Sequence, residues 1–370
     1  MTATDAAIDS VETAVYTVPT DAPEADGTFS WDATTLVLVS LRAAGVVGTG
    51  WTYGAPACAA VVRDHLVPVV QGRSAFDVAG TWEQMVRALR NVGRPGIGGM
   101  ALSAVDLAMW DLKARLFDLP LHKLLGAVHD EVPLYGSGGF TTYDDTQLRE
   151  QLTDWVNRDR IPRVKIKIGE ARGTRVDRDV DRVQVSRAAI GDETELYVDA
   201  NGGYSVAQAV RVARRLCDAD VRWFEEPVSS DDLDGLRQVR QSTSMDVTAG
   251  EYGYDLAYFE RMAAAGSVDV LQVDVSRCAG VTEWLRVAAV AAAHGLEVSG
   301  HCAQSLHLHP ACSVPNLAHL EYFHDHARVD RLLFEGPADP QGGVLSPDLD
   351  RAGMGIHLKR ADADQYRCAV

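Results

Sequence analysis

Three carboxylates follow strand-like segments of this chain at one regular spacing. They are Asp199, Glu225 and Glu251, and each stands at the end of a short run of apolar, β-prone residues. The two intervals are equal, since 225 − 199 = 26 and 251 − 225 = 26. A strand, a helix and two loops use roughly 25 residues in a parallel α/β barrel. The spacing therefore predicts successive βα units with an acid at the end of each strand.

These acids are predicted to meet at one place. All strands of parallel βα units end at the same side of the sheet, so acids at corresponding ends converge. A single acid after a strand often only faces water, but three at one period are not explained that way. Crowded carboxylates repel one another strongly at low dielectric. A hard divalent cation with oxygen ligands would remove that repulsion, so we predict a cation site at Asp199, Glu225 and Glu251.

Length and charge limit the possible partners. The chain has 370 residues with 35 basic and 52 acidic side chains, a formal net charge of −17. This charge argues against binding to nucleic acid or to an anionic membrane surface, and an anionic substrate would need a local positive site. The length suits one barrel-sized domain and a smaller domain, with a core that is stable without crosslinks.

Cysteine usage and hydropathy indicate the compartment. The first ten residues are acidic and lack an apolar core, which is not the pattern of a signal peptide, and no apolar run approaches the roughly 18 residues of a membrane span. We therefore expect a cytoplasmic protein. Its cysteines have no paired spacing, so we interpret them as reduced, mostly buried thiols: Cys58, Cys217, Cys278, Cys302, Cys312 and Cys368.

The first part of the chain is predicted to be a small α+β capping domain, residues 1–126. The pattern indicates strands over 11–18, 34–41 and 46–53, and helices from Cys58 onward, the clearest over 99–117. Strands followed by helices without alternation are typical of an α+β domain. Residues 21–32 are polar and rich in turn formers, so we expect a mobile loop there.

The second part, residues 127–329, is predicted to be the barrel. Eight strand segments alternate with helical ones, which favours a TIM-type (β/α) barrel, in the modified (β/α)7β form, over an open doubly wound sheet. Residues 330–370 are rich in glycine and proline and contain no βα unit. We expect this C-terminal segment to return to the capping domain.

Two lysines share one face of a predicted strand. Lys165 and Lys167 alternate with valine and isoleucine, which usually means a half-exposed strand with lysines in water. In a barrel, however, helices cover the outer face, so the lysines must point inward, near the acids. An ammonium beside a second ammonium and a divalent cation has a lowered pKa, as a lysine needs to act as a base near neutral pH.

Asp274 and His301 end neighbouring predicted strands, since 301 − 274 = 27. His301 alone could be a structural histidine, one of eleven in the chain. An aspartate at the end of the adjacent strand would fix the tautomer of the imidazole and raise its basicity. With the lysines across the barrel mouth, a substrate would have a basic group on each face.

Other candidates are less clear from the sequence. Glu321 follows the last predicted strand, where it could donate a hydrogen bond if protonated or could lie in a loop. Asn201 and Glu226 are expected to support the metal shell rather than to join it. Five further residues are candidates for contact with a substrate, although packing is the simpler explanation for those of the small domain: Trp51, Tyr53, Arg94, Ser137 and Tyr252.

Taken in order, these pieces resemble the enolase superfamily, mandelate racemase subgroup. The match extends over nearly the whole chain and includes the cap-helix segment 103–113. Each piece alone is a weak signal, but the ordered set is specific: Lys165-x-Lys167, Asp199-x-Asn201, Glu225-Glu226-Pro227, Gly250-Glu251, Asp274, Gly280-Val281-Thr282, His301 and Glu321.

The resemblance implies a cofactor and a site. It implies one Mg²⁺ on the three acids, with Lys167 and His301 as the acid/base pair and Lys165 helping to stabilise a dianionic intermediate. It also implies that cap loops near 19–31 and 48–53 close over the barrel and select the substrate. Tyr252 departs from the pattern, because many relatives carry asparagine after the third metal-binding acid, so the distal pocket is expected to differ.

The implied reaction is abstraction of the proton α to a carboxylate of a small-molecule substrate. The expected outcome is dehydration of a sugar acid, an aldonate or aldarate, to a 2-keto-3-deoxy acid. A cycloisomerase acting on an anhydro or lactone-type sugar acid is the alternative, and a racemase or epimerase would use the same first step. From another class, the chain could be a catalytically silent metal-binding barrel. We also expect a homo-oligomer.

Overall fold

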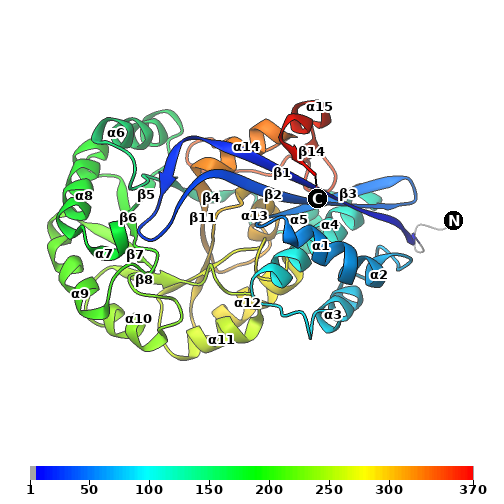
Figure 1. Cartoon of the computed structure of the whole chain (residues 1–370), viewed down its shortest axis with the longest axis horizontal. Coiled ribbons are helices and arrows are strands. Elements are labelled where there is room, and N and C mark those ends of the chain that lie inside the picture. The colour runs from blue at the N-terminus through cyan, green and yellow to red at the C-terminus, as the bar shows by residue number, and fades with distance from the viewer. Residues whose placement is uncertain (1–5, 370) are drawn as a thin grey trace.

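The computed structural model describes residues 6–369, which form a capping region and a barrel (Figure 1). Residues 1–5 of the predicted capping domain and residue 370 of the predicted C-terminal segment lie outside the described residues. The capping sheet has the strand order β15-β1-β2-β3. Its first three strands are antiparallel neighbours: β1 (Ile8–Ala25), β2 (Ser30–Ala43) and β3 (Val46–Tyr53).

The predicted mobile loop at residues 21–32 is wrong. Most of it belongs to β1 and β2, which form one long hairpin with its turn at Asp26–Phe29, where the backbone N–H of Asp26 donates to the carbonyl of Phe29 at 3.0 Å. The segment is polar because it bonds to barrel loops and not because it is a free loop. The backbone N–H of Thr141, for example, donates to the carbonyl of Ala25 at 2.8 Å.

The capping helices pack on one side of this sheet. The longest of them, α4, is almost entirely buried and lies across β3, where Gly50 permits the contact, since a Cβ there would be 2.4 Å from the backbone nitrogen of Ala108. The helix predicted over 99–117 is thus confirmed in position. The cap helices are α1 (Ala57–Val61), α2 (Val67–Val70), α3 (Val78–Ala88), α4 (Ile97–Leu116) and α5 (Leu121–Leu125).

Eight parallel strands close into a barrel, because β11 pairs with β4. This confirms the predicted TIM-type barrel. The strands are β4 (Val132–Gly138), β5 (Arg163–Lys167), β6 (Glu195–Asp199), β7 (Val221–Glu225), β8 (Asp246–Ala249), β9 (Val270–Val273), β10 (Glu297–Gly300) and β11 (Leu317–Phe323). Their outward-facing aliphatic residues form the main core with the surrounding helices.

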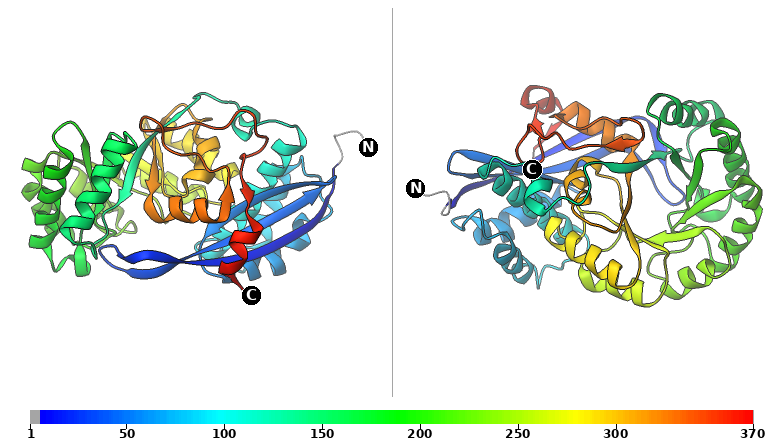
Figure 2. Two further views of the ribbon diagram at one scale, coloured as in Figure 1. Left: turned by 90° about the horizontal axis from the view of Figure 1, so that it is seen from above. Right: turned by 180° about the vertical axis from the view of Figure 1, so that it is seen from behind.

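The barrel helices lie outside the strands, as Figure 1 and the view from behind in Figure 2 show. Side-chain caps fix where several of them begin. Asp144 accepts from two backbone N–H groups at the start of α6, and Asp232 and Asp255 cap two later helices. The helices are α6 (Asp145–Thr153), α7 (Glu170–Gly173), α8 (Val176–Ile190), α9 (Val206–Arg215), α10 (Leu233–Arg240), α11 (Leu256–Ala264), α12 (Val281–Ala293) and α13 (Gln304–Ala311).

The end of the chain runs back to the capping sheet. Helix α14 (His324–Leu333) spans the boundary predicted at residues 329 and 330. The short strand β15 (Arg367–Cys368) pairs antiparallel with β1, and α15 (Arg360–Ala363) precedes it. In the view from above in Figure 2, the β1–β2 hairpin extends from this region along one end of the barrel.

Among residues 6–369, the structure has no helix that is both long and apolar enough to cross a membrane.

Candidate active site

The three periodic acids lie at the carboxyl ends of neighbouring strands. Asp199 and Glu225 are the last residues of β6 and β7 and stand side by side in register, while Glu251 follows β8 by two residues. All three are buried, and one oxygen of each lies within 4.8 Å of an oxygen of the other two. A cluster of this kind can hold a divalent cation, because hard cations take carboxylate oxygens as ligands.

Backbone geometry places the third acid. Gly250 has φ +137°, and a Cβ there would lie 2.2 Å from the carbonyl oxygen of Gln272 on the next strand. Only glycine fits a backbone that runs this close to its neighbour. Gly250, between β8 and Glu251, is therefore needed for the backbone turn that directs the carboxylate of Glu251 into the barrel mouth.

The two lysines of β5 point into the barrel. Lys165 is fully buried, pairs with Glu225, and has its Nζ 2.9 Å from Glu321 Oε1. Lys167 pairs with Asp199, its register partner on β6. The residues that alternate with the lysines, Val164 and Ile166, belong to the core beneath the outer helices. Because side chains alternate along β5, the charged lysines point into the barrel and the aliphatic residues pack against the outer helices.

The lowered pKa expected for Lys167 belongs to a site that holds a divalent cation, whereas the side chains of this chain act on that pKa in the opposite direction. Burial is the largest single influence and lowers the pKa of Lys167, but Asp199, Glu321 and Glu225 together outweigh it, so the pKa is raised. The pKa of Lys165 is raised as well, because Glu225 and Glu321 together outweigh its burial. The prediction assumed a divalent cation on the acids, whereas here the ammonium groups themselves pair with the acids.

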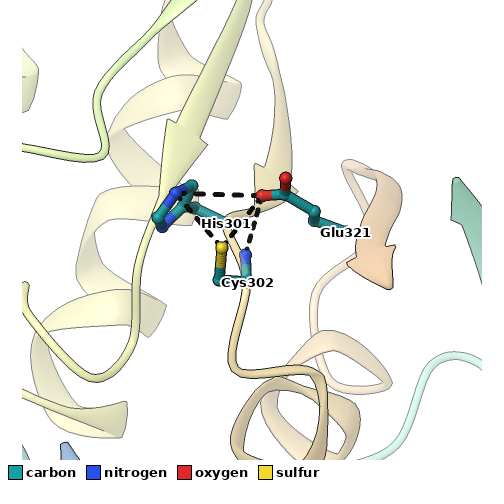
Figure 3. A group of neighbouring side chains, drawn as sticks. All are labelled: His301, Cys302 and Glu321. Atoms are coloured by element: carbon teal, nitrogen blue, oxygen red, sulfur yellow. Dashed lines mark hydrogen bonds and ion pairs between the residues drawn. The ribbon is translucent and has the colours of Figure 1, made fainter. Parts of the chain in front are cut away.

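His301 and Asp274 form a hydrogen-bonded pair. The two residues directly follow the adjacent strands β10 and β9, and His301 Nδ1 lies 2.9 Å from Asp274 Oδ2. Because an ionised carboxylate only accepts hydrogen bonds, Nδ1 is the donor and Nε2 faces the barrel mouth. There Nε2 lies 3.2 Å from Glu251 Oε2 and 3.8 Å from Glu321 Oε2, and Figure 3 shows His301 and Glu321 facing each other.

Charged neighbours set the pKa values of this pair. Burial alone would raise the pKa of Asp274, but its bond to His301 and its contact with Arg277 hold that pKa below the usual range. Burial lowers the pKa of His301, whereas Cys302 and Glu251 raise it. The net pKa is well above normal. The pair therefore favours a positively charged imidazole held by anionic neighbours.

Glu321 is an ionised residue inside the barrel. It is neither the protonated donor nor the loop residue that the sequence suggests. It belongs to β11 and not to a loop, and it is fully buried. Burial raises the pKa of Glu321, but Lys165 and His301 lower it by more, to well below normal. A carboxylate in this state accepts hydrogen bonds, as it does from the backbone N–H of Cys302 at 2.9 Å, and does not donate them.

Asn201 and Glu226 lie beside the acid cluster. The backbone N–H of Asn201 donates to Asp199 Oδ1 at 2.8 Å, and burial raises the pKa of Glu226, which Glu251 raises further. Asn201 Oδ1 and Glu226 Oε1 are buried without a hydrogen-bond partner among the described residues. Buried oxygens without donors fit a site that receives a cation with its bound water.

A cavity of about 410 Å³ connects this cluster with the cap. Its lining includes both predicted proton-transfer groups and Glu251, together with residues that the sequence did not single out. Arg277 lies four residues after the end of β9, a position that could have indicated it, whereas Cys302 is recognisable in the sequence as a neighbour of His301 but only as a bystander. The sequence could not indicate Asp26 and His326, because they reach the site through the folding of the β1–β2 hairpin and of α14. The lining of the cavity includes Asp26, Trp31, Thr34, Tyr53, Lys167, Asn201, Glu251, Tyr252, Arg277, His301, Cys302 and His326.

The predicted substrate contacts divide into two groups. Tyr53 and Tyr252 line the cavity, Tyr53 with its ring stacked on His326. Three others lie outside the cavity lining. Trp51 is fully buried against Phe334, with ring centroids 4.5 Å apart, Arg94 ties the cap to Glu283 at 3.2 Å, and Ser137 is buried in β4. Contact of these three residues with a substrate therefore stays a prediction.

Two family models match the sequence. The first, "Mandelate racemase / muconate lactonizing enzyme, N-terminal domain", matches residues 10–126. The second, "Enolase C-terminal domain-like", matches residues 147–363. A relative from Streptomyces coelicolor, named 3,6-anhydro-alpha-L-galactonate cycloisomerase, is 32% identical over 360 residues, which cover 95% of this chain and 97% of the relative.

Solved structures show the same fold. A mandelate racemase/muconate lactonizing enzyme-like protein from Rubrobacter xylanophilus is 47% identical with a TM-score of 0.95, covering 98% of this chain and 100% of that chain. The L-talarate/galactarate dehydratase of Salmonella typhimurium LT2, liganded with Mg and L-lyxarohydroxamate, is 26% identical with a TM-score of 0.89, covering 99% of this chain and 94% of that chain.

Proposed function

Since the chain belongs to the mandelate racemase/muconate lactonizing enzyme family of the enolase superfamily, we propose that it is a magnesium-dependent enzyme that removes the proton α to the carboxylate of a sugar acid. The proposed overall reaction is the dehydration of an aldonate or aldarate to a 2-keto-3-deoxy acid.

One observation carries this proposal. Lys167 and His301 line the same cavity as Glu251, the third acid of the cluster. Their strands, β5 and β10, are separated by β4 and β11 around the closed barrel, so the two groups reach the cavity from different sides. A purely structural cavity needs neither a lysine nor a histidine there, whereas proton transfer at a carbon atom needs a base and gains from a second group opposite it.

The donor set fits Mg²⁺. Asp199, Glu225 and Glu251 would hold the ion, with Asn201 and Glu226 beside them. When bound, Mg²⁺ supplies Lewis-acid stabilisation of the negative charge that develops on the substrate carboxylate. The magnesium in the related Salmonella dehydratase structure supports this assignment.

The side chains of this chain supply the remaining chemistry. Lys165 carries a positive charge at the base of the site, where it stabilises the anionic substrate after deprotonation. Either Lys167 Nζ or His301 Nε2 takes the α proton. His301 then gives a proton to the departing β-hydroxyl, which leaves as water, and the resulting enol becomes the 2-keto acid. Asp274 holds the imidazole of His301 in the orientation that both transfers require.

A cycloisomerase is the second candidate. The named Streptomyces relative, which matches nearly the whole chain, favours this reading. The first step would be the same, but the departing oxygen would belong to a ring of the substrate, so no water would be lost. Screening aldonates, aldarates and anhydro sugar acids for 2-keto products, with the product mass measured, separates the two reactions.

A silent metal-binding barrel is the alternative from another class. Solvent-deuterium exchange at the α-carbon distinguishes it from an enzyme, because exchange reports proton removal even where no product accumulates. We expect exchange with Mg²⁺ that is lost in Lys167→Ala and without the metal. Binding of sugar acids without exchange in every case would refute the enzymatic proposal.

Assembly and location complete the proposal. We propose a homo-oligomer in the cytoplasm. All six cysteines are free, which is the expected state in a reducing compartment. Light scattering of the purified protein measures the assembly directly, and a single monomeric species at micromolar concentration would contradict it.

A further inference from the structure

Three potential metal ligands of different chemistry meet beside the acid cluster. They are the imidazole of His301, the thiol of Cys302 and the carboxylate of Glu321. Cys302 Sγ lies 3.3 Å from His301 Nε2 and 3.5 Å from Glu321 Oε2, and Nε2 and Oε2 are 3.8 Å apart (Figure 3). The three atoms thus form a nearly equilateral triangle.

This triangle has the size of one face of a zinc coordination tetrahedron. Zinc binds sulfur at about 2.3 Å and nitrogen or oxygen at about 2.0–2.2 Å, so tetrahedral ligands are separated by about 3.4–3.6 Å. The three observed separations of 3.3, 3.5 and 3.8 Å differ from these values by no more than about 0.4 Å. Small side-chain adjustments would be enough to place a cation between the three atoms.

The backbone holds the thiol in this place. Cys302 and Ala303 both have positive φ values, 46° and 42°, a conformation that costs free energy for residues other than glycine. The turn is fixed by two hydrogen bonds, from the N–H of Cys302 to Glu321 Oε2 at 2.9 Å and from the N–H of Ala303 to His326 Nδ1 at 3.0 Å. The triangle therefore does not depend on a freely rotating loop.

The cluster can be reached from the cavity. A cation bound to its three ligands would have its fourth coordination position on the cavity side. His301 and Cys302 line the cavity of about 410 Å³, while Glu321 is fully buried behind them. Three protein ligands with one open position towards a cavity are the usual arrangement of accessible zinc sites. The set also differs in kind from the oxygen-only acid cluster, because sulfur and imidazole select softer cations than magnesium.

We propose that His301, Cys302 and Glu321 bind a zinc-type divalent cation, and that this cation inhibits the enzyme by occupying His301 Nε2. Binding releases the thiol proton of Cys302 and the Nε2 proton of His301 to solvent, and a metal–sulfur bond and a metal–nitrogen bond form in their place. The inhibitory part rests on the proposed function, in which Nε2 moves protons. The binding part does not depend on any activity.

Cobalt(II) tests the binding part, because a cobalt–thiolate bond gives a charge-transfer absorption in the near ultraviolet. The protein is titrated with Co²⁺ while Mg²⁺ is present in large excess. We expect one equivalent of the band per chain in wild type and in the control Cys217→Ser, whose thiol is exposed, and no band in Cys302→Ser. A band that persists in Cys302→Ser, or its absence from wild type, would overturn the proposal.

A second binding measurement needs no variant and so does not depend on the folding of Cys302→Ser. Iodoacetamide labelling with peptide mapping reports each thiol separately. We expect stoichiometric Zn²⁺ to reduce labelling of Cys302 at least tenfold and to leave Cys217 unchanged. Equal labelling of Cys302 with and without Zn²⁺ would overturn the binding site.

Enzyme assays at saturating Mg²⁺ test the inhibitory part. We expect micromolar Zn²⁺ to inhibit wild type and Cys217→Ser equally, and Cys302→Ser to need at least ten times more Zn²⁺ for the same fractional loss. Unchanged sensitivity of Cys302→Ser would mean that zinc acts at the three acids and would refute this inference. Failure of the proposed function is seen separately, as absence of activity in all variants without zinc.

Discussion

The backbone N–H of Arg172 donates a 2.8 Å hydrogen bond to the carbonyl of Gly27, which joins the segment after β5 to the tip of the capping hairpin. At that tip there is no space for a side chain. A Cβ on Gly27 would lie 2.6 Å from the carbonyl oxygen of Ile168 and 2.9 Å from that of Ala200. The hairpin is thus seated directly over the ends of the strands that carry Lys167 and Asp199.

Gly27→Val is expected to lower kcat/KM by about tenfold or more, because the added side chain pushes the hairpin off the strand ends and opens the site to water. The hairpin tip contributes little to the core, so the melting temperature should change by no more than a few degrees. Steady-state kinetics and thermal unfolding measure both.

Gly80→Ala is the matched control for this variant. Gly80 lies inside α3, and a Cβ there meets no atom within 4 Å. Alanine should raise stability by about 0.5–1 kcal/mol through its helix propensity and leave kcat/KM unchanged. Full activity of Gly27→Val would show that the seating of the hairpin is not needed for turnover.

Asp274→Asn is expected to lower kcat by about 10- to 100-fold, with a smaller effect on KM. The variant keeps the shape of the side chain but removes the negative charge that stabilises a protonated His301. The pH profile of kcat should shift together with the loss of rate. Ser276→Ala removes one hydrogen bond to Asp274 without touching His301, and an equal loss in that variant would point to general disruption.

Chelation is expected to abolish activity without unfolding the protein. Lys165 and Lys167 already pair with the acids, so the charges of the cluster are offset within the chain. An ion at 100 times its dissociation constant adds only about 2.7 kcal/mol of stability, so the melting temperature should fall by about 5 °C or less after treatment with EDTA. Added Mg²⁺ should restore the rate. Turnover that survives exhaustive chelation would contradict the proposed cofactor.

The sequence predicted the barrel and the grouping of its acids because both follow from a repeated unit. Each of Asp199, Glu225 and Glu251 stands at or just after the end of a strand, and closure of the barrel brings these strand ends together. The Asp274–His301 pair follows from the same rule. The spacing of the strand-end acids and the alternation of side chains along a strand are local properties of the sequence, and they are retained in the folded protein.

What the sequence could not give depends on contacts between distant segments. The sequence predicts a loop where the structure has the hairpin, because its polar residues do not reveal that they contact barrel loops, as Ala25 contacts Thr141. Trp51 and Arg94 adjoin the cap in sequence, but their burial is decided by Phe334 and Glu283, each more than 150 residues away. The raised pKa of Lys167 likewise depends on which partner its ammonium contacts.

Asp106 is expected to make stability depend on pH at the junction of cap and barrel. This residue of α4 is fully buried, and its carboxyl group accepts from the backbone N–H of Thr282 at 2.9 Å and from its hydroxyl at 2.6 Å. Burial raises the pKa of Asp106 from 3.8 to about 7, although the bonds from Thr282 oppose this. The folded protein therefore keeps a proton that the unfolded chain loses.

The sign of the effect follows from that difference. Between pH 3.8 and about 7 the unfolded chain has an ionised Asp106 and the folded chain a neutral one, so folding stability falls as pH rises through this window, by about 1.4 kcal/mol per pH unit. The contribution is fully present below pH 3.8 and is lost above about pH 7. Asp106→Asn cannot ionise and retains partners in Thr282.

Urea unfolding at pH 4.5, 6 and 8 tests this expectation. Asp106→Asn should be more stable than wild type at pH 8, by on the order of 2–4 kcal/mol, and the difference should shrink steadily towards pH 4.5. Asp64→Asn is the control, because Asp64 is exposed beside Arg63 and should leave the pH dependence unchanged. If wild type and Asp106→Asn lost stability equally between pH 4.5 and 8, Asp106 would already be ionised in the folded protein, with Thr282 as sufficient compensation for its charge.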